Sequence, residues 1–401
     1  MTEQEQRWPL QGVRVLDLGQ LYNGPYAGFL LAHAGADVVK VEPPGGEALR
    51  DRGGGQPSMA LAMLNTRKRG ITINLKSERG RALLFDLAKQ ADVFLENFAP
   101  GALARLGVSA EDLMAANPRL VYASGTGYGL SGPSRDNLAM DLTVQAVGGV
   151  MSINGAEDGP PLKAGLAICD FLGAVHLYSG IMTALYERSV TGRGRFVEVA
   201  MQEALYPALA SNIAGLYRNG WKQPPRRGNK HPNRGSSPYN VYACRDGHVA
   251  IISVREVHWS NLLKLMGRED LLNEPRFETQ SMRAQHEDEI DALVESWTSR
   301  HGRDEAVGLL REHRIPAAPV RNLEEVTADR HMHERGMLHD VDDPVLGRIV
   351  LNTSPLRFAG TPPPEIGDWP DVGEHQAEVL HDWLGLDEAA MKELERNGAF
   401  E

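Results

Sequence analysis

Cysteine is almost absent from this sequence, and that scarcity narrows the fold and the compartment. Among 401 residues there are two cysteines, Cys169 and Cys244. Two thiols cannot form a disulfide framework for a chain of this length, and no C-x-x-C pair suggests zinc. The histidines lack metal-ligand spacing, so we predict no metal site. A reducing, cytoplasmic compartment fits this composition.

Long apolar runs and a positive net charge are also missing. The 42 basic and 53 acidic side chains give a net charge of −11, which argues against general nucleic-acid binding. The polar first residues do not resemble a signal peptide, and no apolar stretch approaches the roughly 18 residues needed to cross a bilayer. We therefore expect a soluble, intracellular protein that contacts neither nucleic acid nor membrane. The cluster Arg67-Lys68-Arg69 is either a local anion pocket or solvated surface.

What the sequence does contain is a regular alternation of apolar strands and amphipathic helices, which predicts an open α/β sheet with mostly parallel strands. Strands are expected at 12–19, 36–42, 70–75, 92–95, 120–123 and 196–200. Helices are expected at about 25–33, after the cap residue Ser77, after a capping box of Ser109 and Asp112, and from Phe171 to about Arg188.

The pattern changes after about residue 220, which indicates a second domain. We divide the chain into a large α/β domain (1–220), a linker (221–238), a small α+β domain (239–325), and a linker and C-terminal part that returns to the large domain (326–401). The small domain is expected to open with a hairpin of 239–243 and 248–253 and to continue with helices over about 257–310. Helices near 375–384 and 387–396 close the chain.

The most informative residue is Asp170, where a loop turns into a long apolar helix. An Asp at such a position is commonly an N-cap that accepts hydrogen bonds from free backbone amides. The residue alone does not justify a role as a nucleophile. The helix dipole would favour its ionised form by up to ~1 kcal/mol. The neighbouring Cys169 is interpreted as a buried, inert thiol, and His176 as a core or interface histidine.

A glycine pattern at Gly127-Tyr-Gly129-Leu-Ser-Gly132 matches the spacing of a dinucleotide-binding loop. That mechanism requires a helix N-terminus directly afterwards, to hold the pyrophosphate. Pro133-Ser-Arg-Asp136 follows instead, and no acidic residue stands at the required distance. We therefore do not predict a nicotinamide cofactor.

Several segments together resemble the class III coenzyme A transferase family, which includes formyl-CoA transferase, carnitine CoA-transferase and, more distantly, α-methylacyl-CoA racemase. The resemblance spans almost the whole chain, and the order of the segments makes it specific. The matching segments are 12–18 with Gly24-Pro25, 35–42, 65–76, 91–101, 117–124, 148–149, 167–176, 191–194, 201–204, 314–320 and 373–375.

The resemblance implies a fold, an activity and a set of site residues. It implies a Rossmann-like large domain, a smaller α+β domain and an interlocked homodimer. Its activity would be transfer of CoA from an acyl-CoA to a free carboxylic acid through an aspartyl anhydride and an aspartyl-CoA thioester, with CoA as substrate and no permanently bound cofactor. By position, Asp170 matches the nucleophile. The matching CoA contacts are Tyr22, Asn23, Ile73, Asn74, Leu75, Lys76, Asn97, Phe98, Ala99, Arg105, Leu138, Ala139, Met140 and Asp141.

Two positions depart from formyl-CoA transferase: Pro43 replaces an Arg that contacts CoA there, and Tyr22 replaces a Gln that positions acyl intermediates. Two other functions stay open. A racemase of the related branch has a His before the position of Asp141, where this chain has Met140, which cannot carry a proton. A non-catalytic CoA-binding protein is the second alternative.

The resemblance leaves the acids and the loops undetermined. Neither donor nor acceptor acid is identified by the sequence. The segments around 221–238 and 335–364 are interpreted as loop-like linkers compatible with interlocked chains. The first contains Lys230, His231 and Arg234, which could neutralise an acceptor carboxylate or lie in a solvated linker.

Overall fold

The structure is a computed structural model that describes residues 7–53, 58–232, 234–363 and 365–400. The chain forms two compact units. The larger unit contains the described residues of 1–148, 165–206 and 327–401, and the smaller one those of 149–164 and 207–326. The predicted small domain covered 239–325. In the structure, residues 149–164 and 207–238 belong to the same unit as that region, and the chain returns to the larger unit at 327.

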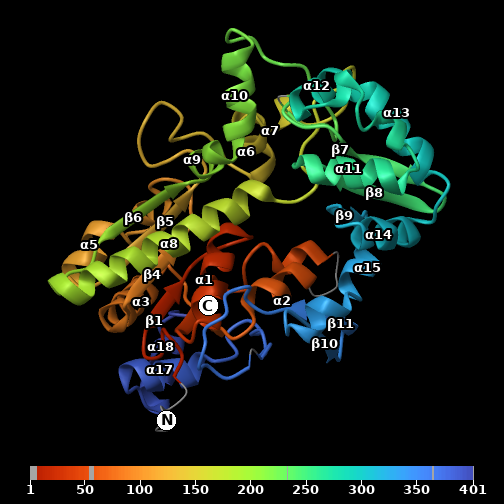
Figure 1. The fold of residues 1–401 in the computed structure, drawn as a ribbon. Helices are drawn as coiled ribbons and strands as arrows, with labels where there is room; N and C mark the ends of the chain where they lie inside the picture. The colour runs from red at the N-terminus through yellow and green to blue at the C-terminus, as the bar shows by residue number, and fades with distance from the viewer. Residues whose placement is uncertain (1–6, 54–57, 233, 364, 401) are drawn as a thin grey trace. The chain divides into compact units, whose positions relative to one another are not determined.

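A parallel sheet of six strands is the centre of the larger unit (Figure 1). The strands are β1 (Arg14–Asp17), β2 (Asp37–Glu42), β3 (Arg69–Thr72), β4 (Val93–Glu96), β5 (Val121–Thr126) and β6 (Phe196–Ala200). Their order is β3-β2-β1-β4-β5-β6, and every pair is parallel. The direction of winding reverses between β1 and β4, and in such sheets ligands bind outside the carboxyl ends at that reversal. The prediction of an open parallel α/β sheet is confirmed.

Helices cover both faces of this sheet because alternate strand residues point to opposite sides. On one face, Leu16 and Val39 pack with apolar side chains of α3, α5, α17 and α18. On the other, Val15 and Val38 pack with α1 and α8. The helices of this unit are α1 (Asn23–His33), η1 (Arg50–Gly53), α2 (Met59–Asn65), α3 (Glu78–Gln90), α4 (Ala102–Arg105), α5 (Ala110–Ala116), α6 (Asp141–Val147), α8 (Ile168–Thr191), α9 (Met201–Leu205), α16 (Arg330–Glu334), α17 (Gln376–Leu384) and α18 (Glu388–Arg396).

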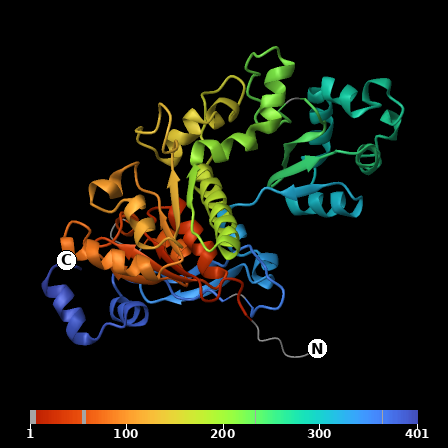
Figure 2. The ribbon, with the colours of Figure 1, turned by 90° about the vertical axis from the view of Figure 1, so that its left-hand side faces the viewer.

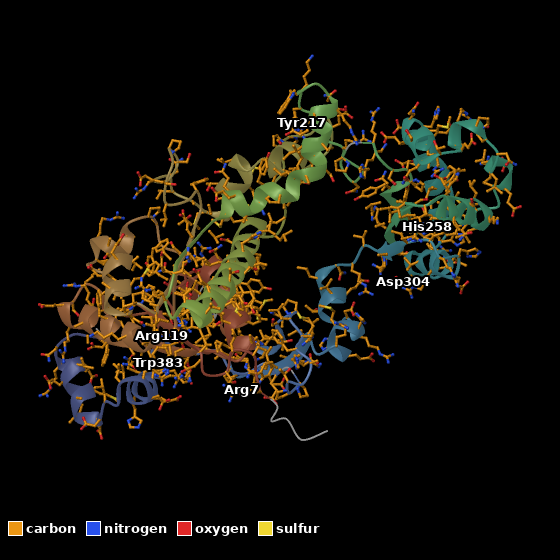
Figure 3. All side chains as sticks on the ribbon, turned by 60° about the vertical axis from the view of Figure 1, so that its left-hand side comes forward. Arg7, Arg119, Tyr217, His258, Asp304 and Trp383 are labelled. Carbon is orange, nitrogen blue, oxygen red and sulfur yellow. The ribbon has the colours of Figure 1, made fainter. Side chains whose placement is uncertain are left out.

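The C-terminal segment joins the N-terminal sheet. Helix α17 contacts α3 and β3, and Figure 2 shows the blue C-terminal helices beside the red and orange N-terminal elements. Trp383 of α17, labelled in Figure 3, donates a hydrogen bond from Nε1 to Asp37 Oδ2 over 2.8 Å. Before it, β10 (Leu338–Asp343) and β11 (Gly347–Asn352) form an antiparallel hairpin. The interpretation of 335–364 as a loop-like linker is therefore wrong for the hairpin residues.

The smaller unit contains an antiparallel sheet of β7 (Tyr239–Cys244), β8 (Gly247–Ile252) and β9 (Ala317–Pro319). The predicted hairpin corresponds to β7 and β8. Apolar residues of the sheet and of the helices after it form one core, which includes Tyr242, Trp259 and Trp297. The helices are α7 (Val150–Ile153), α10 (Ala210–Arg218), α11 (Glu256–Leu265), η3 (Glu269–Leu271), η4 (Pro275–Phe277), α12 (Gln280–Gln285), α13 (Glu287–Thr298) and α14 (Arg303–Glu312). Two short helices, η2 (Tyr206–Leu209) and α15 (Leu323–Thr327), each share one terminal residue with the larger unit.

The basic cluster at 67–69 is neither an anion pocket nor solvated surface. Lys68 is buried, and its ammonium contacts Asp17 Oδ2 at 2.8 Å. Arg69 pairs with Asp37 at 2.7 Å and also with two acidic residues of α17. The Arg67 guanidinium lies 5.1 Å from the centre of the Trp8 ring. All three side chains therefore make internal contacts.

Helix α8 corrects one expectation about apolar runs. It has 24 residues, and an 18-residue window within it has a mean hydropathy of 1.4, which by length and composition alone would suffice to cross a bilayer. The expectation that no apolar stretch reaches this length is wrong. Its packing explains the composition, because α8 lies against β5, β6 and α1, where Ala174, Leu177 and Ile181 are buried in the core of the larger unit (Figure 1).

Candidate functional site

Asp170 lies in the first turn of α8, which begins at Ile168, three residues before the predicted start. The helix N-cap is Ala167, which has no side chain to accept a hydrogen bond. Asp141 of α6 takes this role instead. Its Oδ1 accepts from the backbone amide of Cys169 at 2.8 Å and from that of Asp170 at 3.3 Å. The N-cap interpretation of Asp170 is therefore wrong, and its carboxylate is left for other contacts.

Gln145 holds the Asp141 carboxylate in place. It lies one turn further along α6, is completely buried, and donates from Nε2 to Asp141 Oδ2 at 2.5 Å. The same nitrogen is 3.2 Å from the Leu166 carbonyl oxygen, just before α8. Both carboxylate oxygens of Asp141 are thus engaged in fixing the start of α8.

Asn23 joins the start of α1 to the start of α8. Its Nδ2 donates to the Asp170 carbonyl oxygen at 3.1 Å. The side chain lies between two glycines, because a Cβ on Gly125 would come within 2.3 Å of Asn23 Oδ1 and a Cβ on Gly173 within 2.4 Å of Nδ2. Any larger residue at either position would displace Asn23 from Asp170.

Burial makes the Asp170 carboxyl group a weaker acid than usual. Its pKa rises from an ordinary 3.8 to about 7, mainly because burial disfavours the charged form and secondly because Asp141 is negatively charged nearby, while Arg52 opposes the rise. The dipole effect predicted for the helix start, up to ~1 kcal/mol, is smaller than this change. The neighbouring Cys169 thiol is fully buried and its pKa is raised to about 12, as expected for an inert thiol.

Aromatic side chains from α1 flank the start of α8. The Tyr26 ring meets the Phe171 ring edge-on at 4.8 Å between centroids, and the Tyr22 ring lies 6.2 Å from it. Tyr22, which departs from formyl-CoA transferase, therefore packs next to the residue that follows Asp170. His176, expected in a core or interface, is exposed on α8, with Nδ1 2.8 Å from the Leu172 carbonyl oxygen.

A cavity of about 380 Å³ opens at the carboxyl ends of β1, β2 and β3. Five of the predicted CoA contacts line it together, along with Pro43, the second departure. The lining residues are Leu18, Gln20, Val41, Glu42, Pro43, Pro44, Ile73, Asn74, Leu75, Lys76, Phe98 and Leu106. Its walls are mainly apolar, and Lys76 is the one cation among the described residues that line it. Such a cavity suits a planar base next to a phosphate.

A second cavity of about 230 Å³ lies beside Phe98, which lines both. Ala99, another predicted CoA contact, belongs to this one. Glu96 and Ser124 lie in its buried wall, and burial raises the pKa of Glu96 to about 7. Glu96 Oε2 accepts from the Phe98 amide at 2.7 Å, which fixes the turn after β4.

The remaining predicted contacts lie elsewhere on the larger unit. Asn97 uses its side-chain amide on the backbone of Gln20. Arg105 on α4 is exposed and is not among the residues lining either cavity. Leu138 and Met140 are exposed before α6, and Ala139 packs against Gly127. Their roles as CoA contacts stay predictions.

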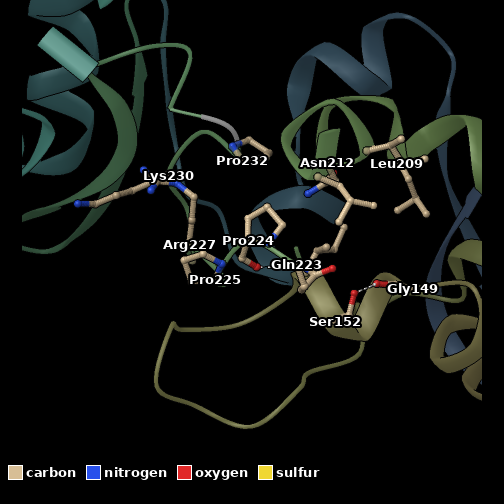
Figure 4. Close-up of a pocket in the computed structure, with 14 residues that line it drawn as sticks. Gly149, Ser152, Leu209, Asn212, Gln223, Pro224, Pro225, Arg227, Lys230 and Pro232 are labelled. Carbon is tan, nitrogen blue, oxygen red and sulfur yellow. Dashed lines mark hydrogen bonds between the residues drawn. The ribbon is translucent and has the colours of Figure 1, made fainter. Parts of the chain in front are cut away.

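The smaller unit has its own cavity, of about 210 Å³, between α10 and the 223–232 segment (Figure 4). Lys230 lines it, and in Figure 4 its side chain extends away from Asn212. The Lys230 ammonium pairs with Asp288 at 2.5 Å and Asp291 at 3.2 Å. The Arg234 guanidinium lies 3.9 Å from Glu287. The charges proposed to neutralise an acceptor carboxylate are thus paired with acidic groups of the same unit.

Three structurally important residues are absent from the sequence-based prediction, namely Gln145, Lys40 and Asp17. Gln145 donates a hydrogen bond to Asp141. The two residues are four apart on a helix, and this spacing in the sequence could have indicated that their side chains are neighbours. Lys40 and Asp17 are buried in strands, and the signal was a charge within an apolar run. Among the described residues, no group of three or more His, Cys, Asp or Glu side chains is arranged to hold a metal ion.

Known proteins resemble this chain along most of its length. The family model "CoA-transferase family III" matches residues 10–376. The chain is 37% identical to a formyl-CoA:oxalate CoA-transferase of Streptomyces avermitilis, over 97% of this chain and 98% of that protein. It is 34% identical to a succinyl-CoA–D-citramalate CoA-transferase of Chloroflexus aurantiacus, over 99% and 100%. It is 33% identical to a succinate–glutarate CoA-transferase of Agrobacterium fabrum, over 95% and 97%.

A solved structure shows the same fold. The crystal structure of a CAIB/BAIF family protein from Brucella suis superposes with a TM-score of 0.82 at 32% identity, covering 94% of this chain and 99% of that one.

Proposed function

The chain belongs to CoA-transferase family III, and we propose that its Asp170 carries first an acyl group and then CoA. A carboxylate oxygen of Asp170 attacks the thioester carbonyl of acyl-CoA, and CoA leaves as a thiolate, which gives a mixed anhydride. The thiolate attacks the aspartyl carbonyl and releases the donor carboxylate, so that Asp170 holds CoA as a thioester. The split into two easier displacements is what covalent catalysis contributes.

The acceptor acid then reverses these steps. Its carboxylate attacks the aspartyl thioester and expels the thiolate, and the thiolate takes the acyl group from the new anhydride, which regenerates the Asp170 carboxylate. Each step exchanges one anion for another, so the cycle consumes neither a proton nor a redox equivalent.

The observation that carries this proposal is the state of the Asp170 carboxylate. Among the described residues, no hydrogen bond contributes to its pKa; burial and the charges of Asp141 and Arg52 do. Asp141 satisfies the helix amides that Asp170 would otherwise cap. A carboxylate that is partly desolvated and has free oxygen lone pairs is a better nucleophile than one held in an ion pair or a cap.

We assign the CoA nucleotide to the cavity at the carboxyl ends of β1–β3. Ile73, Leu75 and Phe98 provide apolar surface for the adenine, and Lys76 a positive charge for a phosphate. Pro43 cannot donate a hydrogen bond to the nucleotide, so the positive charge comes from Lys76, the one cation among the described residues that line the cavity. The other predicted contacts would lie along the remainder of the CoA.

Short dicarboxylic acids are the proposed acyl donors and acceptors. Oxalate, citramalate and glutarate, in the names of the relatives, all have two carboxylates. The test is to incubate the protein with succinyl-CoA and each free acid and to follow new acyl-CoA by liquid chromatography. Asp170→Ala should abolish transfer to every acid. A variant that still transfers CoA at the wild-type rate would contradict the proposal.

A racemase is the second candidate, and Met140 argues against it because a thioether cannot exchange the α-proton. Incubation of a 2-methylacyl-CoA in D2O distinguishes the two functions. The transferase leaves the α-carbon unlabelled, whereas a racemase introduces deuterium there.

We also propose a cytoplasmic homodimer. The α8 residues Tyr186 and Val190 are each 75% exposed, and Val175 is 44% exposed, which is apolar surface for a second copy to cover. Light scattering should give about twice the 43.9 kDa mass of the chain. Interlocked chains cannot separate without unfolding, so a dimer that dissociates on simple dilution would contradict the interlocked arrangement.

A further inference from the structure

The loop between β1 and α1 has an unusual backbone. Leu21 is in the left-handed region, with φ of 60°, a conformation that an L-residue with a Cβ adopts at a cost of about 1 kcal/mol or more. Directly after it come Tyr22 and Asn23, and Asn23 holds the Asp170 carbonyl. The contacts that hold the backbone of Leu21 therefore also determine the position of Asn23 against the Asp170 carbonyl.

Asn97, at the carboxyl end of β4, holds this loop from one side. Its Oδ1 accepts from the Gln20 amide at 2.7 Å, and its Nδ2 donates to the Gln20 carbonyl at 3.0 Å. One side chain thus satisfies both backbone groups of a single residue. A Cβ on Gly24 would come within 3.0 Å of Asn97 Oδ1, so the start of α1 also packs against this amide.

A buried ion pair holds the loop from the other side. Glu47 Oε2 accepts from the Leu21 amide at 2.8 Å, and Glu47 Oε1 contacts the Lys40 ammonium at 2.5 Å. Both side chains are almost completely buried. Lys40 in turn donates to the Gly19 carbonyl at 3.2 Å. Three consecutive residues, 19 to 21, are therefore anchored to the side chains of Lys40 in β2, Asn97 directly after β4, and Glu47 in the segment after β2.

We propose that Asn97 is a positioning residue for the nucleophile: its two-way contact with Gln20, together with the Glu47–Leu21 bond, sets the loop that places Asn23 against Asp170. This inference rests on the proposed function. It assigns the Asn97 side chain a role different from the CoA contact implied by family resemblance, and Gln20 engages both its Oδ1 and its Nδ2. Asn97 acts on the reaction through the loop and not by touching the substrate.

The test is the rate at which Asp170 becomes acylated in a single turnover at saturating acyl-CoA, measured on the full-length protein by quenched mass spectrometry. Asn97→Ala should lower this rate by about ten- to a hundredfold, since misplacement near 1 Å has effects of that size. Asn97→Asp keeps an acceptor for the Gln20 amide and loses the donor, so its rate should fall between those of the wild type and Asn97→Ala.

Asn117→Ala is the matched control. Asn117 also clamps the backbone with its side chain, donating to the Ala88 and Ala91 carbonyls and accepting from the Arg119 amide, but it precedes β5, at the opposite end of the sheet. The Asn117→Ala protein should be less stable than the wild type, and its Asp170 should be acylated at the wild-type rate. Glu47→Gln is a second probe of the loop and should slow acylation like Asn97→Ala.

The outcomes separate the two proposals. If wild-type protein is acylated and Asn97→Ala is acylated equally fast at saturation but with a higher KM for acyl-CoA, Asn97 is a CoA contact and the inference fails while the function stands. If wild-type Asp170 is not acylated by any CoA thioester, the proposed function itself fails.

Discussion

Replacing the nucleophile with its neutral isostere should inactivate the protein and make its larger unit more stable at alkaline pH. The pKa of Asp170 rises from 3.8 in its ordinary state to about 7 in the fold. At ~1.4 kcal/mol per pKa unit, ionised Asp170 destabilises the folded state by up to ~4 kcal/mol. Asp170→Asn carries no charge at this position, so it removes this destabilisation. With an unfolding entropy of about 2.1 cal/mol/K per residue, the melting temperature should rise by a few degrees.

The sign of the pH dependence is specific. Above pH 7 Asp170 is ionised in both folded and unfolded chains, so the advantage of Asp170→Asn is complete. As the pH falls from about 7 to 3.8 the folded protein takes up the proton first, and the advantage shrinks to nothing. Thermal unfolding between pH 5 and pH 8.5 measures it. Asp136→Asn, at a carboxylate whose side chain is 85% exposed, is the control and should change little. An Asp170→Asn protein no more stable than wild type at pH 8 would refute the burial argument.

Three further changes have defined outcomes. Asp141→Asn removes the like charge beside Asp170, so the pH of half-maximal kcat should move below about 7, and a pH–rate profile with an unchanged midpoint would contradict this. Lys76→Ala should raise the KM for acyl-CoA roughly tenfold through loss of a charge-assisted hydrogen bond, with little change in kcat. The difference in KM between this variant and the wild type should become smaller in high salt. Equal KM values for the two proteins would contradict the assignment of the nucleotide to this cavity. Lys68→Met leaves Asp17 buried without its 2.8 Å partner, so it should lower the free energy of unfolding, measured in urea, by about 3 kcal/mol or more. Asp17→Leu combined with Lys68→Met should recover part of that loss. A Lys68→Met protein as stable as the wild type would show that the Lys68–Asp17 ion pair contributes nothing to stability.

The sheet was predictable because most of its strands contain short apolar runs and its helices carry local start signals. Ser77 and Ser109 cap α3 and α5 as predicted, each accepting from the amide three residues on. Such signals act within one turn of chain. The hairpin of β10 and β11 was missed because 338–343 carries three Asp residues, which are disfavoured in strands.

The candidate site depends on partners far apart in the sequence, and there the prediction was incomplete. The cap of α8 comes from Asp141, 28 residues before Cys169, so the N-cap interpretation of Asp170 could not be excluded from local pattern. Lys40 occupies a fully buried strand position that an apolar pattern assigns to Val or Ile; its partner Glu47 lies beyond a loop. Family resemblance predicts roles for Asp170, Lys76 and Phe98, but it gives no sign that the Asn97 side chain binds the backbone of Gln20.

The proposed catalysis requires that the Asp170 carboxylate become covalently joined to CoA. The direct measurement is to incubate the wild-type protein with succinyl-CoA, add borohydride, digest the protein and sequence the peptide containing Asp170 by mass spectrometry. Reduction of an aspartyl thioester converts the side chain to an alcohol, so residue 170 should be read as homoserine, and only when the thioester substrate was present. An unmodified aspartate at 170 in protein that is actively transferring CoA would contradict this mechanism.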